Sequence, residues 1–186
     1  MAWCEIDKEL IDSLVSLIGD KKVLEVCSGK GELAKALLDK NISIKATGKL
    51  QSSYDGENPE LSCEIEDIDA ASAARKYKDD FDLILVSWAI TDDSFLQAAA
   101  IFNKPILFIG ELYHKHKMNV WGYSSNASDN YFENVIDVQD PILLKKGHLS
   151  YHKLKEKINL VDPINLNIYS WNNKDKFQQD IDNYNN

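Results

Sequence analysis

The sequence lacks an excess of basic residues. Its 186 residues contain 21 Lys and Arg against 30 Asp and Glu, which gives a formal net charge of −9. Proteins that hold nucleic acid mainly by charge need basic surface to replace the counterions of the phosphates. The net charge therefore gives no strong indication of nucleic-acid binding, although it does not exclude a local basic patch.

Cysteines are few, and long apolar runs are missing. Cys4, Cys27 and Cys63 are odd in number and widely spaced, so they predict neither a disulfide framework nor a CxxC metal site. The sequence has no secretory h-region and no apolar run long enough to cross a bilayer. We therefore expect a soluble, cytoplasmic protein without a membrane partner. No internal repeat is present, and we expect one domain over 1–171 followed by a polar tail over 172–186.

The sequence does contain an alternation of apolar strands with amphipathic helices. The expected helices are 5–18, 32–40, 68–78 and 94–102, and the expected strands are 22–27, 41–47, 61–65, 81–87 and 105–109. The segments FDLILVS and PILFI are nearly unbroken apolar runs, typical of strands covered on both faces. The alternation predicts an α/β three-layer sandwich, with a mostly parallel sheet between two helical layers.

The C-terminal third has a weaker pattern. Residues 111–129 show no period and are interpreted as an irregular loop, a candidate lid. A helix is expected over 151–158, and INLNIYSW, at 164–171, alternates as a last strand would. The asparagine-rich end is expected to be a frayed tail, although Phe177, Ile181 and Tyr184 could form one face of a short terminal helix.

The stretch VLEVCSGKGELAKAL runs from a strand through two glycines into a helix. Ligands of open parallel sheets bind beyond the carboxyl ends of the strands. Gly29 and Gly31 would let the chain turn tightly and bring its backbone close to such a ligand. Glu25 would then point toward the ligand, where its carboxylate can accept hydrogen bonds from an ammonium group.

This stretch resembles motif I of the class I S-adenosylmethionine-dependent methyltransferases, an acid followed by three glycines at alternate positions. Glu25 matches the acid, Gly29 and Gly31 match the last two glycines, and Cys27 replaces the first. The resemblance covers roughly residues 5–110. It implies a Rossmann-like sheet of seven strands, the last antiparallel, with S-adenosylmethionine as the cofactor.

The resemblance also implies roles for individual residues. Glu25 would lie near the methionine amino group, with Ser28 to Gly31 beneath the methionine part, so that a branched side chain at Gly31 would occupy cofactor space. Asp67 would bind the adenine amino group, and Ile68 would pack on the ring. The full set of implied cofactor-binding residues is Glu25, Cys27, Ser28, Gly29, Gly31, Leu50, Asp67, Ile68, Ser87 and Trp88, the last two bordering the transferable methyl.

Two features of the family pattern are missing. The family has an acid after the second strand that holds the ribose hydroxyls, whereas ATGKLQSS places Lys49 and Leu50 there and leaves Gln51, Ser52 or Asp55 as substitutes. The Asn/Asp-Pro-Pro-Tyr/Phe signature of amino-directed DNA methyltransferases is also absent after the fourth strand. A small molecule or a protein is therefore favoured over a DNA base as the methyl acceptor.

Other interpretations of single motifs are weaker. GKGELA also fits a loose GxGxxA dinucleotide fingerprint, but the acid expected after the second strand is missing. The histidine pairs 114/116 (with Glu111) and 148/152 lack a third ligand at convincing spacing, so no metal site is predicted. Cys27 has no histidine nearby in sequence to activate it. Trp88, Trp121 and Tyr123 could line an acceptor pocket but are more typical of a core.

The sequence thus supports two hypotheses of different classes. The first is an S-adenosylmethionine-dependent methyltransferase acting on an unknown acceptor. The second is a catalytically inactive methyltransferase-like module that binds or regulates a partner, such as another protein. Cofactor binding discriminates between them.

Overall fold

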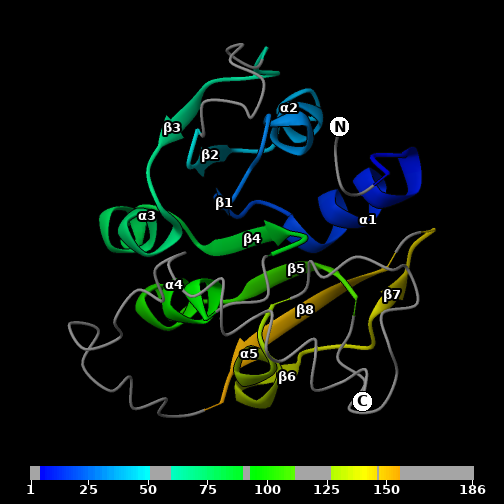
Figure 1. Ribbon diagram of the computed structural model, residues 1–186. Helices are drawn as coiled ribbons and strands as arrows, with labels where there is room; N and C mark the ends of the chain where they lie inside the picture. The colour runs from blue at the N-terminus through cyan, green and yellow to red at the C-terminus, as the bar shows by residue number, and fades with distance from the viewer. Residues whose placement is uncertain (1–4, 51–59, 90–92, 112–126, 146, 156–186) are drawn as a thin grey trace, which may run out of the picture.

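The computed structural model describes residues 5–50, 60–89, 93–111, 127–145 and 147–155. Its centre is one sheet with the order β3-β2-β1-β4-β5-β8-β6, and β7 pairs with β8 beside this path (Figure 1). The strands are β1 Val23–Val26, β2 Ile44–Gly48, β3 Ile65–Asp67, β4 Leu83–Ser87, β5 Ile106–Gly110, β6 Val135–Asp137, β7 Ile142–Leu143 and β8 His148–Leu154. The helices are α1 Lys8–Ile18, α2 Glu32–Leu38, α3 Ala70–Tyr77, α4 Ser94–Phe102 and α5 Asp129–Asn134.

Strands β1 to β5 run parallel to one another. Strand β8 is antiparallel to both β5 and β6. The expected α/β architecture with a mostly parallel sheet is therefore confirmed. The sheet of the described residues has eight strands rather than the seven expected, and the two-residue β7, paired to β8, is the addition.

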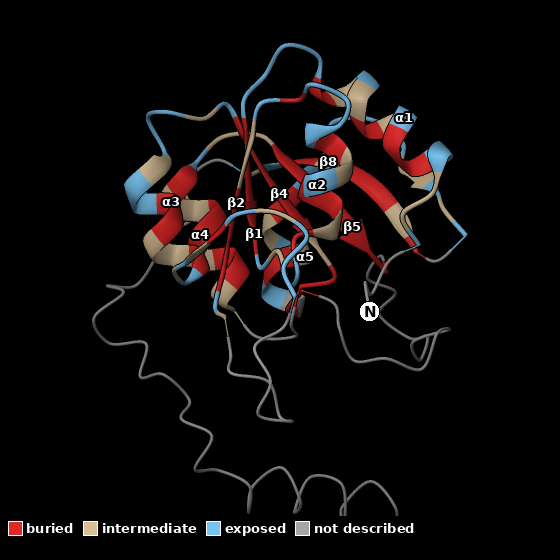
Figure 2. Ribbon diagram, turned by 90° about the horizontal axis from the view of Figure 1, so that it is seen from above, coloured by how far each residue is buried: buried red, intermediate tan, exposed pale blue. Residues whose placement is uncertain are grey.

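The helices cover both faces of the sheet because successive strand residues point to opposite sides. Leu24 and Val26 of β1 lie in the cluster that packs under α3, α4 and α5, whereas Val23 lies in the cluster under α1 and α2. The same alternation holds in β4 and β5, whose residues are all buried except Ser87. Figure 2 shows this buried centre, with exposed residues on the outer faces of the helices.

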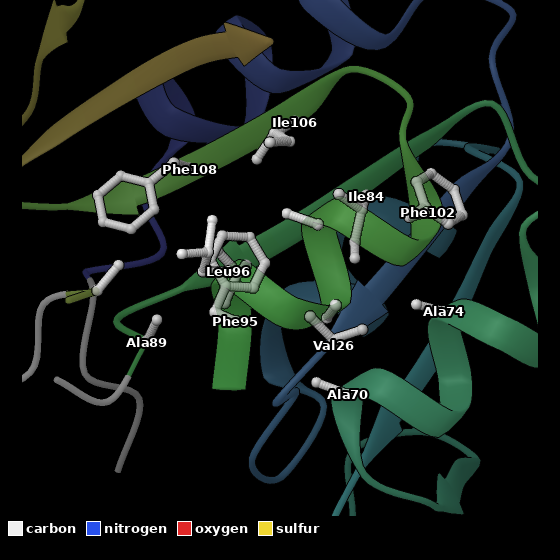
Figure 3. Packing of buried hydrophobic residues seen from close by; sticks show 14 of the residues in the cluster. Val26, Ala70, Ala74, Ile84, Ala89, Phe95, Leu96, Phe102, Ile106 and Phe108 are labelled. Carbon is white, nitrogen blue, oxygen red and sulfur yellow. The ribbon is translucent and has the colours of Figure 1, made fainter. Parts of the chain in front are cut away.

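Large aromatic and aliphatic side chains of α4 fill the first cluster. Figure 3 shows Phe95, Leu96 and Phe102 of this helix beside Ile84 and Ile106 of the sheet. Helix α3 contributes small residues at the contact, Ala70, Ala73 and Ala74, which are buried. Small side chains let two helices approach closely, and α3 and α4 lie side by side (Figure 1).

Helix α1 has well-defined ends. The Asp7 carboxylate accepts a hydrogen bond from the Leu10 N–H at 2.9 Å, which caps the first turn. The helix ends at Gly19, whose φ of +57° is a conformation that glycine adopts without steric cost. A Cβ at this glycine would meet nothing within 4 Å.

Two sequence expectations about secondary structure were wrong. The third strand covers Ile65–Asp67 rather than 61–65, so Leu61 lies before it in irregular backbone. The described start of the helix expected over 151–158 belongs instead to the strand β8, which ends at Leu154. Ser150 and His152 of this strand are buried, as is Leu149. Because two of the buried positions hold polar residues, the sequence does not show the apolar alternation of a strand.

The C-terminal part also contains elements that the pattern did not predict, namely α5, β6 and β7. Most of the expected loop over 111–129, the expected strand over 164–171 and the tail over 172–186 lie outside the described residues. Among the described helices, none is long and apolar enough to span a membrane.

Candidate functional site

The strand order reverses between β1 and β4. From β1 the chain proceeds outward through β2 and β3, then returns to place β4 on the other side of β1. In open α/β sheets, ligands bind beyond the carboxyl ends of the strands at such a reversal. We call the carboxyl ends of β1 to β4 the carboxyl edge, and all ten residues expected to bind cofactor lie at or beside it.

The turn after β1 is fixed by hydrogen bonds to β2. The Ser28 hydroxyl donates to the Thr47 carbonyl at 2.9 Å, and its oxygen accepts from the Thr47 N–H at 3.1 Å. The Thr47 hydroxyl in turn donates to the Glu25 carbonyl at 2.8 Å. Cys27, at φ +57°, is exposed in this turn. These contacts hold the turn in one position against the second strand.

The two motif glycines serve different purposes. Gly29 and Gly31 both have positive φ, at +57° and +76°. A Cβ at Gly31 would lie 2.7 Å from the Cys63 Sγ and 3.0 Å from the Ile65 Cδ1, so this glycine allows the turn to pack against the segment leading into β3. A Cβ at Gly29 would meet nothing within 4 Å. A side chain at Gly31 would therefore meet the protein itself, and of the two glycines only Gly29 has an open Cβ direction.

Glu25 is a buried acid with an unsatisfied oxygen. The residue is 1% exposed, and among the described residues none forms a hydrogen bond with its Oε2. Burial raises the pKa of this carboxyl to about 8, while an interaction with the Ser28 hydroxyl partly opposes the rise. A bare carboxylate in this position is costly, so the group favours either a proton or a cationic neighbour.

The ends of β2 and β3 are joined by Asp67. Its Oδ1 accepts a hydrogen bond from the Leu50 N–H at 3.2 Å and lies 3.7 Å from the Lys49 Nζ. Asp67 is exposed and Leu50 half-buried. The neighbouring Ile68 is also half-buried and packs against the core cluster under α3 and α4. An acid thus does lie beside the end of β2, but it comes from β3.

Ser87 and Trp88 end the central strand β4. Trp88 has a φ of +53°, which is uncommon for a bulky residue. Its backbone N–H donates to the Ile109 carbonyl at 2.7 Å. Its side chain is buried in the cluster under α1 and α2, which agrees with a core role. The indole Nε1 is buried, and no described residue accepts its hydrogen.

The described histidine pair that was considered as a source of metal ligands does not converge on one point. His148 and His152 are on the strand β8, where four residues span about 13 Å, too far to share one ion. His152 instead contacts Tyr131 and Asp137. No group of three His, Cys, Asp or Glu side chains with metal-site geometry exists within the described part of the chain. His114 and His116 lie outside it.

Sequence reasoning missed two contributors to this edge. Thr47 is fully buried and links the turn after β1 to β2. Its position before Gly48 at the end of an expected strand could have indicated that Thr47 lies at the carboxyl edge. Cys63 faces Gly31, and its Sγ lies 3.5 Å from the Gly31 carbonyl oxygen. No spacing in the sequence indicates that contact, because it depends on how the segment before β3 folds back.

Comparisons with known proteins show similarity in structure only. No protein-family model matches the sequence, and no curated protein does either. A mutant of MtNAS in complex with S-adenosylmethionine aligns with a TM-score of 0.56 at 13% identity, over 79% of this chain and 60% of that one.

Two further solved structures align with similar scores. The mitomycin 7-O-methyltransferase MmcR gives a TM-score of 0.50 at 12% identity, over 75% of this chain and 50% of that one. TehB from Haemophilus influenzae gives 0.51 at 11% identity, over 81% and 62%. At such identities the likeness establishes a shared fold, and the chain covers 50% to 62% of MmcR, MtNAS and TehB.

Proposed function

We propose that this chain, whose fold is that of the class I methyltransferases, binds S-adenosylmethionine at the carboxyl edge and transfers its methyl group to an acceptor. The observation that carries the proposal is the unsatisfied Oε2 of Glu25, buried at the end of β1 where the strand order reverses. A small molecule or a protein is the acceptor class that we favour.

The residues at the edge fit the methionine part of this cofactor. Glu25 offers a buried acceptor to an ammonium group, and a cation there would offset the cost of ionising the carboxyl. Gly29 provides backbone that a ligand can approach because the direction of its missing Cβ is open. Ser28 keeps this backbone in place through its two contacts with Thr47.

Methyl transfer of this kind places few demands on the protein. The bound cofactor would supply an activated methyl group on a sulfonium. The chain would align the acceptor with that methyl and exclude water, which requires positioning more than a special nucleophile. Ser87, at the end of β4 across from the turn after β1, is the described residue that we assign to the methyl and acceptor side, whereas the Trp88 side chain packs in the core.

A glycine pair tests the proposal directly. Gly29→Leu should abolish binding of S-adenosylmethionine and S-adenosylhomocysteine in calorimetric titrations, because the new side chain would extend into ligand space. The variant should stay folded, with a loss of roughly 1–2 kcal/mol from its positive φ.

Gly19→Leu is the matched control. Gly19 has the same φ and an equally open Cβ direction, but it ends α1 away from the edge. This variant should lose stability and keep ligand affinity. If the parent protein gives no binding, or if Gly29→Leu binds as the parent does, the proposed site is wrong.

A second candidate function is a module that binds the ligand without turnover. Lys49, which follows β2 where the family pattern has an acid, favours this alternative. The two candidates separate in an assay for S-adenosylhomocysteine formation with small-molecule and protein acceptors. Binding without product in every case would support the module.

A further inference from the structure

The Asp67 carboxylate extends from its own strand to the neighbouring one. Asp67 is the last residue of β3, in register with Gly48 at the end of β2. Its Oδ1 nevertheless accepts from the N–H of Leu50, two residues beyond β2, at 3.2 Å. Lys49 lies on the same oxygen, with its Nζ 3.7 Å away. The carboxylate is thus held against the backbone that continues from β2.

The end of the second strand has a defined role in ligand binding by Rossmann-like folds. In Rossmann-like folds, an acid about 20 residues beyond the glycine turn, at the end of the second strand, accepts hydrogen bonds from ribose hydroxyls. In this chain Lys49 and Leu50 occupy that place, and neither side chain can accept a hydrogen bond. The Asp67 carboxylate supplies the missing acceptor from the adjacent strand.

The contacts leave the carboxylate suited to a hydroxyl pair. Both described contacts use Oδ1, and the Asp67 side chain is 55% exposed, so no described contact occupies Oδ2. The Lys49 ammonium, itself 61% exposed, lies 3.7 Å from Oδ1 and attracts the carboxylate toward the end of β2. A carboxylate has several acceptor sites and can accept hydrogen bonds from both hydroxyls of a ribose.

We propose that Asp67 binds the ribose hydroxyls of the adenosyl ligand, rather than the adenine amino group, and that Lys49 positions its carboxylate. The proposal rests on the proposed function, since it specifies how the same ligand is held. It makes the Lys49 and Asp67 pair a replacement for the single acid that usually follows β2.

Three probes distinguish ribose from adenine recognition. They are S-adenosylhomocysteine, its 2′,3′-dideoxy analogue, and the analogue that carries hydrogen in place of the adenine amino group. Asp67→Ala should weaken binding of the first and third probes about tenfold or more, the usual cost of losing a charge-assisted hydrogen bond. It should leave the affinity for the dideoxy probe unchanged.

The opposite pattern would overturn the assignment. If the loss disappears with the probe that lacks the amino group and persists with the dideoxy probe, Asp67 binds adenine. An equal loss for all three probes would indicate a structural role and also exclude the proposal. If the parent binds none of the probes, the proposed function itself fails, which is a separate result.

Two variants control for charge and for position. Glu64→Gln removes one negative charge just before β3 from a side chain that is 93% exposed, and it should change no affinity. Lys49→Gln should weaken S-adenosylhomocysteine binding in the parent but cause no further loss in the Asp67→Ala background. Additive losses would mean that Lys49 acts without Asp67 and would contradict its positioning role.

Discussion

At the scale of single residues, Glu25 has the most unusual environment. An acid in a strand whose four residues are all buried should be rare, because burial disfavours the charged form. With a pKa of about 8, most Glu25 side chains carry a proton at neutral pH while no ligand is bound. Glu25 is therefore a neutral acid in the free protein that loses its proton when a cationic ligand group binds beside it.

The raised pKa predicts how stability changes with pH. From about pH 4.5 to pH 8 the folded protein keeps a proton on Glu25 that the unfolded chain has lost. Stability should therefore fall as pH rises through this window. Glu25→Gln removes this dependence and should become more stable than the parent as the pH approaches 8, in denaturant titrations at pH 5 and pH 8.

The same variant has a readout in ligand binding. At pH 7, S-adenosylmethionine should displace the proton from Glu25, and calorimetry in buffers of different ionisation enthalpy measures this release. Glu25→Gln should bind more weakly without proton release, and S-adenosylhomocysteine, which lacks the sulfonium, should lose less. Proton release that persists in the variant would assign it to another group.

At the scale of secondary-structure elements, a hydrogen-bonded chain joins the buried Tyr131 of α5 and His152 of β8 to the exposed Asp137 of β6. The hydroxyl of Tyr131 lies 2.8 Å from the Nδ1 of His152, and the Nε2 of His152 lies 3.0 Å from the Asp137 Oδ1. Tyr131 packs on Phe95 and Phe108 and is fully buried. A neutral imidazole satisfies both contacts, accepting from Tyr131 and donating to Asp137.

Tyr131→Phe should cost about 1–3 kcal/mol of stability, because it leaves a buried ring nitrogen without its donor. Denaturant unfolding of the variant measures this loss. Tyr151→Phe, a change at a half-buried side chain on β8, the strand that carries His152, is the control and should cost less. Equal costs would mean that the Tyr131 hydroxyl does not stabilise the fold.

Acid should weaken the same region. Burial lowers the pKa of His152 below 6.5, although Asp137 partly opposes this effect. Below that pH the unfolded chain takes up a proton that the folded protein resists, so stability is lost as pH falls. Tyr131→Phe also removes the hydroxyl that favours the neutral ring, so its cost should shrink toward acid pH.

The elements also show where sequence patterns suffice. The strands β1, β2, β4 and β5 and the first four helices followed from apolar periodicity, because their buried positions hold mainly apolar residues. Strand β8 did not, since its buried positions include Ser150 and His152. Their burial depends on partners from α5 and β6, which no local pattern reveals.

The candidate site was predictable to a similar degree. The glycine turn and Glu25 were predictable because a tight connection from a strand to a helix requires glycines at this spacing after the strand. The separate purposes of Gly29 and Gly31 did not, since they depend on Cys63 and Ile65, more than thirty residues away. The contact of Asp67 with Leu50 likewise required the register of β2 and β3.

At the scale of the whole molecule, the expected α/β fold with a mostly parallel sheet is confirmed by the sheet order, and it is shared with solved structures such as MtNAS. The parallel strands β1 to β4 place residues from four separate parts of the sequence at one edge (Figure 1). The sheet order of the described residues is complete at Leu154, the last residue of β8.

The polar tail expected over 172–186 should be dispensable for folding, because its sequence lacks a strong apolar pattern. Deletion of 172–186 should leave the melting temperature nearly unchanged, whereas a chain ending at residue 147 lacks β8 and should not fold. Thermal unfolding followed by circular dichroism compares the two. A large drop for the shorter deletion would show that Phe177, Ile181 and Tyr184 dock on the domain.

The position of β8 between β5 and β6 also fixes an order of events during synthesis. Strand β6 leaves the ribosome before β8, yet β8 is its only described neighbour in the sheet. Until Leu154 has emerged, β5 keeps an open hydrogen-bonding edge and β6 has nothing to pair with. A nascent chain paused in this interval exposes the unpaired edge of the apolar strand β5, and such edges favour aggregation with other unfolded chains, so we expect chaperone binding to matter most in this interval.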